Sequence, residues 1–286
     1  MIKLEKSVWI YLILVMLATY LVQIFIILNG GQEYEFFQPF MVLAMFIPSI
    51  GAIIYLVKSK IGLKYINWKP RTFWYLLLSL LVPIIITLLG RLLFEKIGWG
   101  INHEYLIVDN KVVDIDLSLF LGSEDQSISF FLANFFITML VVNLVSSLLA
   151  FGEEVGWRGF LQKKLLEQNS LLKSIVFLGL VWGFWHLPIV LDGFNYPEYP
   201  ILGAFIFLPI NTVFVSSFLA LLTIKSKSVW PAVFAHGGVN GVMTLLFEMD
   251  FGEYKLQANF GILCIWMVVG VISYIILSKG YRKENV

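Results

Sequence analysis

Long apolar runs constrain the fold of this chain more than any other feature of its sequence. A helix needs about 20 mostly apolar residues to cross the roughly 30 Å hydrocarbon core of a bilayer. About eight runs approach this length: residues 8–28, 40–57, 73–94, 128–150, 171–191, 201–224, 229–247 and 258–277. The whole chain of 286 residues is 59% hydrophobic and 14% charged, which is too apolar for an ordinary soluble domain. We therefore expect an all-α, polytopic membrane helical bundle of about eight transmembrane helices.

The distribution of basic residues predicts the orientation of the bundle. The first run follows Lys3 and Lys6 and lacks a small-residue cleavage site, so we interpret it as a retained span. With the N-terminus inside, all but four of the 20 basic residues fall in cytoplasmic segments, and short basic loops stay in the cytoplasm. We expect an integral membrane protein with both termini cytoplasmic. Its Lys- and Ile-rich composition with a single cysteine favours a bacterial plasma membrane.

The chain is expected to form a single membrane domain over residues 1–286. Residues 1–127 hold the N-terminal spans and an external acidic loop, which we interpret as a scaffold. Residues 128–247 hold the next four runs, and residues 258–286 the last span and a cytoplasmic tail. Within the loop, residues 107–113 predict a small hairpin around Asp109-Asn110. The net charge of +1 and the absence of a basic, aromatic-rich segment indicate no nucleic-acid partner. Oligomeric state is not indicated by the sequence.

An acidic pair follows the fourth run, which carries no charge of its own. Ionised groups are costly in such surroundings, so Glu153, Glu154 and Arg158 are candidates for a function. On a helix, Glu154 and Arg158 lie four residues apart on one face and can pair. Glu153 is rotated by about 100° from Glu154. We therefore expect Arg158 to hold Glu154 and to leave Glu153 free.

Two of the three histidines lie within apolar runs, His186 in the fifth and His236 in the seventh. Asn240 follows His236 by four residues and shares its helix face. Gly237, Gly238 and Gly241 remove bulk beside this pair, which lets a neighbouring helix come close. Each polar side chain could instead join helices through a hydrogen bond, often worth less than about 1 kcal/mol. Their occurrence together with the acidic pair favours chemistry.

These side chains suit hydrolysis by a directly attacking water. Glu153 could act as general base, and His186 could orient the water or assist proton transfer to the leaving amine. His236 and Asn240 could stabilise the oxyanion. No serine or cysteine lies in a recognisable nucleophile setting. Alternatively, Glu153, His186 and His236 could bind a divalent metal such as zinc. The His-Glu-x-x-His motif is absent, so metal dependence stays open.

Three ordered motifs carry a family resemblance: Glu153-Glu154-x-x-x-Arg158, Trp182-x-x-x-His186 and His236-x-x-x-Asn240. With these motifs the chain resembles the CPBP (Abi) family, which comprises intramembrane proteases related to the type II CAAX prenyl endopeptidase and to bacteriocin-processing and immunity proteins. The similar region runs from about residue 128 to 247, which the resemblance implies is the catalytic core. Trp182 stands where the motif commonly has phenylalanine, and we expect this to change pocket shape more than chemistry.

The resemblance implies an eight-helix bundle with an active-site cavity among helices 4–7 that opens to the cytoplasm. It implies Glu153 as the water-activating residue, His186 as its helper, and His236 and Asn240 as the oxyanion hole, with Glu154 and Arg158 in supporting positions. Members are often labelled metalloproteases, although a metal-independent glutamate mechanism is also proposed for them. A prenylated-type tail, or a bacterial leader or signalling peptide, is the implied substrate.

Two other functions are compatible with these motifs. A non-catalytic immunity or scaffold protein of the same fold differs only in not needing an ionisable Glu153. A proton- or ion-coupled transporter would also use intramembrane Glu and His, but the chain shows no repeat of broken helices. In straight spans, Glu153 lies near one end of the fourth run and His186 about 22 Å into the fifth. The hypothesis therefore requires an extended fourth helix, a fifth helix that begins outside the bilayer, or a tilt or kink.

Overall fold

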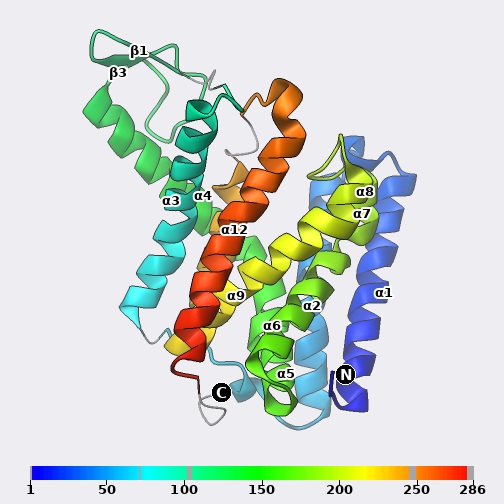
Figure 1. Cartoon of the computed structure of the whole chain (residues 1–286). Helices are drawn as coiled ribbons and strands as arrows, with labels where there is room; N and C mark the ends of the chain where they lie inside the picture. Colours follow the sequence, from blue (N-terminus) through cyan, green and yellow to red (C-terminus); the bar gives the residue numbers. More distant parts are fainter. Residues whose placement is uncertain (1, 71, 102–104, 245–248, 282–286) are drawn as a thin grey trace.

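The computed structural model describes residues 2–70, 72–101, 105–244 and 249–281, and these form a bundle of helices with a small sheet at one end (Figure 1). The first three helices are α1 (Lys6–Leu28), α2 (Phe37–Lys58) and α3 (Phe73–Lys96), with short 3-10 turns η1 (Gly31–Glu33) and η2 (Leu63–Tyr65). The later ones are α4 (Ile128–Gly156), η3 (Trp157–Leu161), α5 (Gln162–Gln168), α6 (Leu171–Trp185), α7 (Leu187–Leu191), α8 (Pro200–Leu202), η4 (Gly203–Phe207), α9 (Leu208–Ser226), α10 (Trp230–Gly241), η5 (Gly252–Tyr254) and α12 (Lys255–Ser278). The predicted class, a polytopic helical bundle, is confirmed.

Six helices in the described part of the chain are long and apolar enough to cross a membrane. They are Lys6–Leu28, Phe37–Lys58, Phe73–Lys96, Ile128–Gln168, Pro200–Ser226 and Gly252–Ser278. The fifth and seventh predicted runs are helical but shorter. Pro188 follows the end of α6, and a proline removes one helical hydrogen bond and clashes with the preceding turn, so α6 and α7 are separate pieces. The seventh run forms α10, and residues 245–248 near its end lie outside the described residues.

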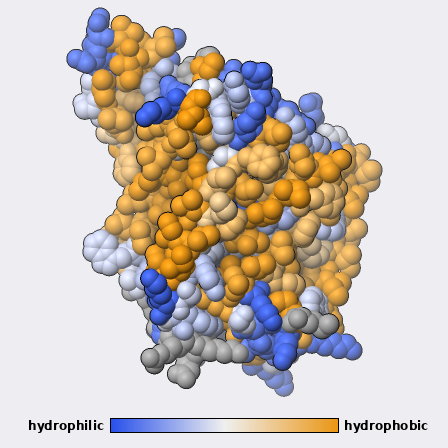
Figure 2. All heavy atoms as spheres, in the orientation of Figure 1, coloured by the Kyte–Doolittle hydropathy of each residue, from blue (hydrophilic) through white to orange (hydrophobic). Residues whose placement is uncertain are grey.

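Apolar side chains cover the middle of the face drawn in Figure 2, between two more hydrophilic ends. Large apolar side chains are exposed on the long helices, for example Leu21 on α1, Leu89 on α3 and Leu148 on α4. Exposed apolar surface of this extent is expected where lipid replaces water. The surface therefore agrees with an integral membrane protein.

The predicted hairpin is present at the end of the bundle that lies away from the start of α1 (Figure 1). Strands β1 (Leu106–Val108) and β2 (Lys111–Val113) pair antiparallel, and β2 also pairs with β3 (Gln126–Ser127). Asp109 and Asn110 both have positive φ angles, 48° and 62°, as a two-residue turn between twisted strands requires. The turn residues and the strand pattern in the sequence thus specify the same structure.

The helix that carries the acidic pair extends well beyond the fourth predicted run. α4, the π-helical segment η3 and α5 follow one another without a break from Ile128 to Gln168. Residues 152–162 are all buried, so the acidic pair lies inside the bundle and not at its edge. The extension of the fourth helix, together with the break after α6, removes the difference in depth that straight spans would impose. π-Helical turns of this kind are frequent at functional sites.

Candidate functional site

The segment with the acidic pair is held in the bundle by a close contact with α2. A Cβ atom added to Gly156 would lie 2.5 Å from the carbonyl carbon of Pro48, and one added to Gly152 would lie 2.8 Å from the carbonyl oxygen of Met45. Only glycine allows the backbones of α2 and α4 to approach this closely. The glycines that flank Glu153 and Glu154 therefore place both carboxyl groups in the interior.

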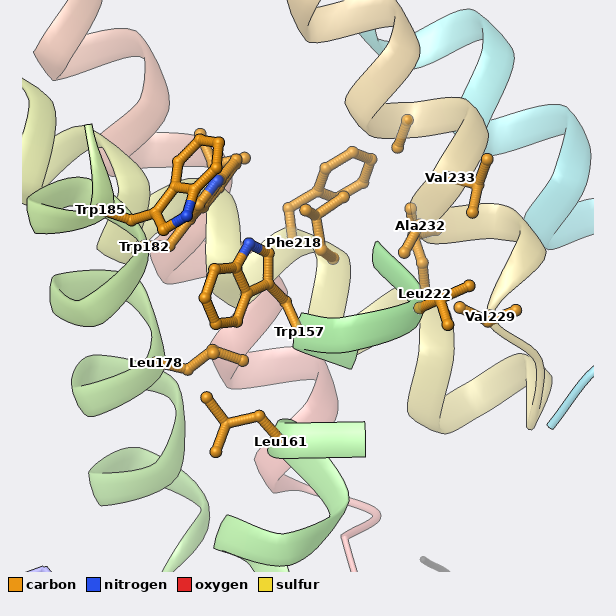
Figure 3. Close-up of a cluster of buried hydrophobic side chains, with 14 of the residues drawn as sticks. Trp157, Leu161, Leu178, Trp182, Trp185, Phe218, Leu222, Val229, Ala232 and Val233 are labelled. Carbon is orange, nitrogen blue, oxygen red and sulfur yellow. The ribbon is translucent and has the colours of Figure 1, made fainter. Parts of the chain in front are cut away.

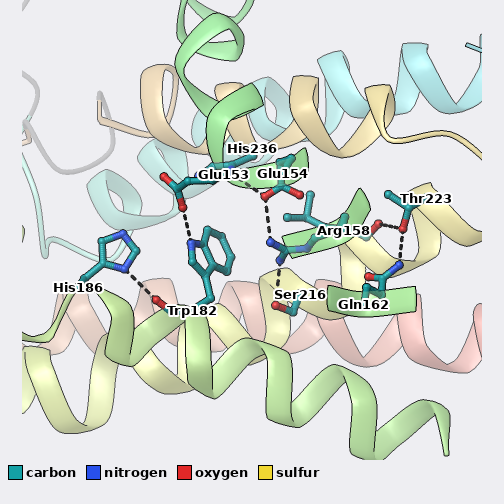
Figure 4. A network of polar contacts seen from close by, with 10 residues as sticks. Glu153, Glu154, Arg158, Gln162, Trp182, His186, Ser216, Thr223 and His236 are labelled. Atoms are coloured by element: carbon teal, nitrogen blue, oxygen red, sulfur yellow. Dashed lines mark hydrogen bonds and ion pairs between the residues drawn. The ribbon is translucent and has the colours of Figure 1, made fainter. Parts of the chain in front are cut away.

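Glu154 forms a buried ion pair with Arg158, as the spacing predicts. Arg158 Nη1 lies 2.9 Å from Glu154 Oε1, and neither side chain has any exposed surface. The same carboxyl oxygen lies 2.8 Å from Nδ1 of His236 on α10. Arg158 Nη2 donates a hydrogen bond to Oγ of Ser216 on α9 at 2.9 Å. Figure 4 shows how this network joins the first and third motifs through one carboxylate.

Glu153 points to the opposite side, toward α6, and it is not free as the sequence suggested. Its Oε2 accepts a hydrogen bond from Nε1 of Trp182 at 2.7 Å (Figure 4). In the described part of the chain no cation forms an ion pair with Glu153, and no hydrogen bond involves its Oε1. Glu153 is therefore fixed by one neutral donor, while its second oxygen remains available.

Trp182 contacts all three motifs. Its ring lies under the Arg158 guanidinium, with the guanidinium carbon 4.6 Å from the ring centroid, and packs edge-on against His236 at 4.9 Å. Its carbonyl oxygen lies 3.0 Å from Nδ1 of His186. The expectation that tryptophan here changes shape more than chemistry stays a prediction, but it took no account of the indole N–H. The indole N–H supplies Glu153 with a hydrogen-bond donor that a phenylalanine could not provide.

The hydrogen bond of His186 defines the proton position on its ring. A carbonyl oxygen can only accept, so Nδ1 carries the proton that is shared with Trp182. In the neutral imidazole Nε2 is then an acceptor. His186 lies at the break between α6 and α7, and its side chain is half-buried.

Polar side chains of α1 stabilise this break. Gln23 Nε2 donates to the carbonyl of Trp185 at 3.1 Å, and its Oε1 accepts from the backbone N–H of Ile189 at 3.4 Å. Thr19 Oγ1 accepts from Nε1 of Trp185 at 2.7 Å. Backbone groups freed at a broken helix need such partners in an apolar interior. The first span thus contributes directly to the position of His186.

Asn240 is the predicted residue that stands apart from this network. It lies one turn after His236 on α10, and its side chain is exposed, whereas His236 is buried. Within the described residues no hydrogen bond joins Asn240 to the other motif side chains. The structure brings together Glu153, Glu154, Arg158, Trp182, His186 and His236, and the role of Asn240 stays a prediction.

An apolar cluster with side chains from η3, α6 and α9 packs around Trp182. Figure 3 shows part of this cluster, which includes the buried side chains of Trp157, Leu161, Leu178 and Phe218. Apolar surroundings strengthen the electrostatic interactions within the network, because a protein interior screens charges much less than water does. The predicted cavity that opens to the cytoplasm stays a prediction.

The described residues contain no group of three or more His, Cys, Asp and Glu side chains that could hold a metal ion. Glu153, His186 and His236, the possible ligands, are directed to different partners: Trp182 Nε1, the Trp182 carbonyl and Glu154. In this geometry they do not fit a shared metal.

Sequence reasoning missed the partners that complete the network. Ser216 and the hydrogen-bonded pair Gln162 and Thr223, 2.8 Å apart, are common residue types in apolar helices and carried no motif. The donor role of Trp182 had a usable signal. A buried indole N–H usually has an acceptor, and a carboxylate in the first motif was available.

Comparison with known proteins agrees with the residues that form this network. The model of the family described as type II CAAX prenyl endopeptidase Rce1-like matches residues 129–242, which contain all three motifs. CAAX prenyl protease 2 of Methanococcus maripaludis is 34% identical to this chain over 59 residues. That match spans 21% of this chain and 21% of the length of this relative. The family resemblance indicated by the motifs is thereby confirmed for this segment of the chain.

Proposed function

We propose that this protein is an intramembrane endopeptidase that hydrolyses peptide bonds with water activated by Glu153. One observation carries the proposal: side chains from α4, α6 and α10 meet in a buried network in which Glu153 forms no ion pair with any of the described residues. A structural ion pair would need only Glu154, Arg158 and His236. The presence of a second buried carboxylate, held by a neutral donor, supports a role for Glu153 in proton transfer.

In the proposed reaction, Glu153 Oε1 takes a proton from a water molecule, and the water oxygen attacks the carbonyl carbon of the peptide bond. His186 accepts a hydrogen bond from this water at Nε2 and so orients it. The proton that Glu153 has taken then passes through His186 Nε2 to the leaving amine nitrogen, so that both side chains return to their starting states. The carbon–nitrogen bond breaks, which leaves a new carboxyl end and a new amine. Each of these transfers follows ordinary general acid–base chemistry.

His236 and Asn240 are the proposed donors to the oxyanion. Glu154 accepts a hydrogen bond from His236 Nδ1 and so fixes the ring. In the imidazolium form Nε2 carries a second proton, which would face the developing negative charge. The exposed amide of Asn240, on the same helix face, is open to a bound substrate. Loss of one such donor has cost about 3–4 kcal/mol of transition-state stabilisation in a measured protease.

The proposed substrates are peptides or proteins whose scissile bond reaches the membrane: a prenylated-type tail, or a leader or signalling peptide. The name of the Methanococcus relative supports the first class. The alternative function is that of a non-catalytic immunity or scaffold protein with the same fold. The buried network alone would serve such a protein equally well, so the two must be separated by experiment.

The decisive experiment compares peptides from cells that carry the wild-type protein, Glu153→Gln or Glu33→Gln. Glutamine keeps the size of Glu153 and can still accept from Trp182, but it cannot take the proton. We expect cleavage products to disappear and their precursors to accumulate in Glu153→Gln only, because Glu33 is exposed in η1. Metal content and chelator sensitivity of the purified wild-type protein are measured in parallel. Unchanged peptides together with full biological activity in Glu153→Gln would favour the scaffold.

A further inference from the structure

A groove between α1 and α2 lies apart from the motif network. It has a volume of about 850 Å³, within the range of about 300–1,000 Å³ that is typical of small-molecule sites. Its walls come from the first half of α1 and the second half of α2, and Lys164 of α5 closes one end. Both helices belong to the candidate membrane spans, so the groove opens toward lipid. We propose that this groove binds an anionic phospholipid, with one acyl chain between the helices and the phosphate at Lys58.

The length and polarity of the groove fit one leaflet of a bilayer. Along α2 the lining residues extend from Ile47 to Lys58, which corresponds to about 16 Å of helix. Half of a hydrocarbon core is about 15 Å. The inner part is lined by aliphatic side chains, among them Ile10, Leu14 and Ile50, and the polar lining residues gather at the other end. A molecule with one apolar chain and one polar head matches this gradient.

The charges at the polar end favour an anionic head group. Lys58, Lys164 and Glu5 line this end, so its formal charge is positive. Lys164 already has acidic neighbours, with Glu167 at 3.3 Å and Glu5 at 3.8 Å. Lys58 is exposed, and in the described part of the chain no ion pair or hydrogen bond involves its ammonium group. A lipid phosphate would provide the missing counter-charge.

The inner wall of the groove is rigid. Tyr11 donates a hydrogen bond to the carbonyl of Pro48 at 3.1 Å, and its ring packs edge-on against Phe160 at 4.8 Å. Tyr55 of α2 also lines the groove, and its ring centroid lies 4.7 Å from that of Phe160. A preformed site loses little conformational freedom when a ligand binds. The groove therefore does not depend on a lipid to form.

Native mass spectrometry of the delipidated protein, titrated with dioleoyl phosphatidylglycerol or dioleoyl phosphatidylcholine, tests the site. Ala18→Phe fills the apolar end, and Leu17→Phe adds the same ring to α1 at an exposed position that does not line the groove. Lys58→Glu reverses the charge at the polar end, and Lys64→Glu does so at an exposed position outside it. Elution profiles and melting temperatures check that all four variants fold.

We expect phosphatidylglycerol to bind the wild-type protein more tightly than phosphatidylcholine. Ala18→Phe and Lys58→Glu should each weaken phosphatidylglycerol binding about tenfold, while Leu17→Phe and Lys64→Glu leave it unchanged. Equal binding of the two lipids, or equal loss in a variant and its matched control, would overturn the proposal. Since no step involves Glu153, this outcome is independent of the proposed protease activity.

Discussion

At the scale of single residues, Trp182 is the side chain whose chemistry can be tested most directly. Phenylalanine at this position keeps a ring against Arg158 and His236 but removes the donor to Glu153. A hydrogen bond to a charged group is worth about 1.5–3 kcal/mol. If Glu153 activates the water, we expect Trp182→Phe to lower kcat about 10- to 100-fold and to leave KM nearly unchanged.

Steady-state cleavage of an identified substrate peptide measures both constants. Trp157→Phe is the matched control, because Trp157 is equally buried and its Nε1 has no hydrogen-bond partner among the described residues. Similar kcat values for Trp182→Phe and the wild type would show that the indole bond is not part of the reaction. A loss confined to Trp182→Phe would distinguish positioning of Glu153 from a general packing defect.

The Glu154–Arg158 pair predicts a stability effect that is separate from catalysis. Removing one partner of a buried ion pair costs about 3–5 kcal/mol, since the other charge is left without compensation. We expect Arg158→Met to destabilise the protein by about this amount, as measured by denaturant unfolding in detergent. Lys255→Met breaks the exposed pair with Glu198 and should change stability little. Equal stability of Arg158→Met and wild type would show that His236 alone compensates Glu154.

At the scale of helices, the close contact between α10 and α4 decides whether the first and third motifs meet. A Cβ atom on Gly237 would lie 2.6 Å from the backbone nitrogen of Ser147, so the helices would have to separate. We expect Gly237→Ala to cost about 1–3 kcal/mol and to break the His236–Glu154 hydrogen bond. At Gly241 the nearest atoms belong to side chains, Ser146 Oγ and Val142 Cγ1, which can rotate.

Thermal unfolding in detergent compares the melting temperatures of Gly237→Ala and Gly241→Ala. Gly241→Ala is the control, because there only side chains have to move. The prediction requires that Gly237→Ala lowers the melting temperature more than Gly241→Ala. The reverse order would mean that α10 can shift along α4 without cost, and that the contact does not set the position of His236.

How much of the structure the sequence predicts depends on how far apart along the chain the interacting residues lie. The Glu154–Arg158 pair and the turn at Asp109-Asn110 depend on neighbours within a few residues, and both were predicted. The hydrogen bonds of Gln23 and Thr19 to the broken fifth span join residues about 160 positions apart. A scaffold of apolar spans gives no signal for such pairings, since any face of α1 could have met α6. The π-helical continuation of α4 likewise depends on burial against α2 and α9.

At the scale of the whole molecule, the separation of charges along the bundle has a consequence for orientation. The start of α1, the turn η2 and the end of α12 lie at one end, and the sheet β1–β3 lies at the other (Figure 1). Most of the basic residues in the described part of the chain lie at the first of these ends, among them Lys58 at the end of α2 and Lys60 and Lys64 between α2 and α3. Short basic loops remain in the cytoplasm. The scissile bond of a substrate would then reach the proposed peptidase site from the cytoplasmic side.

Cysteine labelling in intact cells tests this orientation. Cys264 is the single native cysteine and is exposed on α12, so it is first replaced by alanine. Lys111→Cys then places a thiol in the hairpin, and Lys64→Cys places one in η2. We expect a membrane-impermeant maleimide to label Lys111→Cys in intact cells and Lys64→Cys only after permeabilisation. The opposite pattern would put the basic end outside, against the charge bias, and peptide substrates would have to be sought outside the cell.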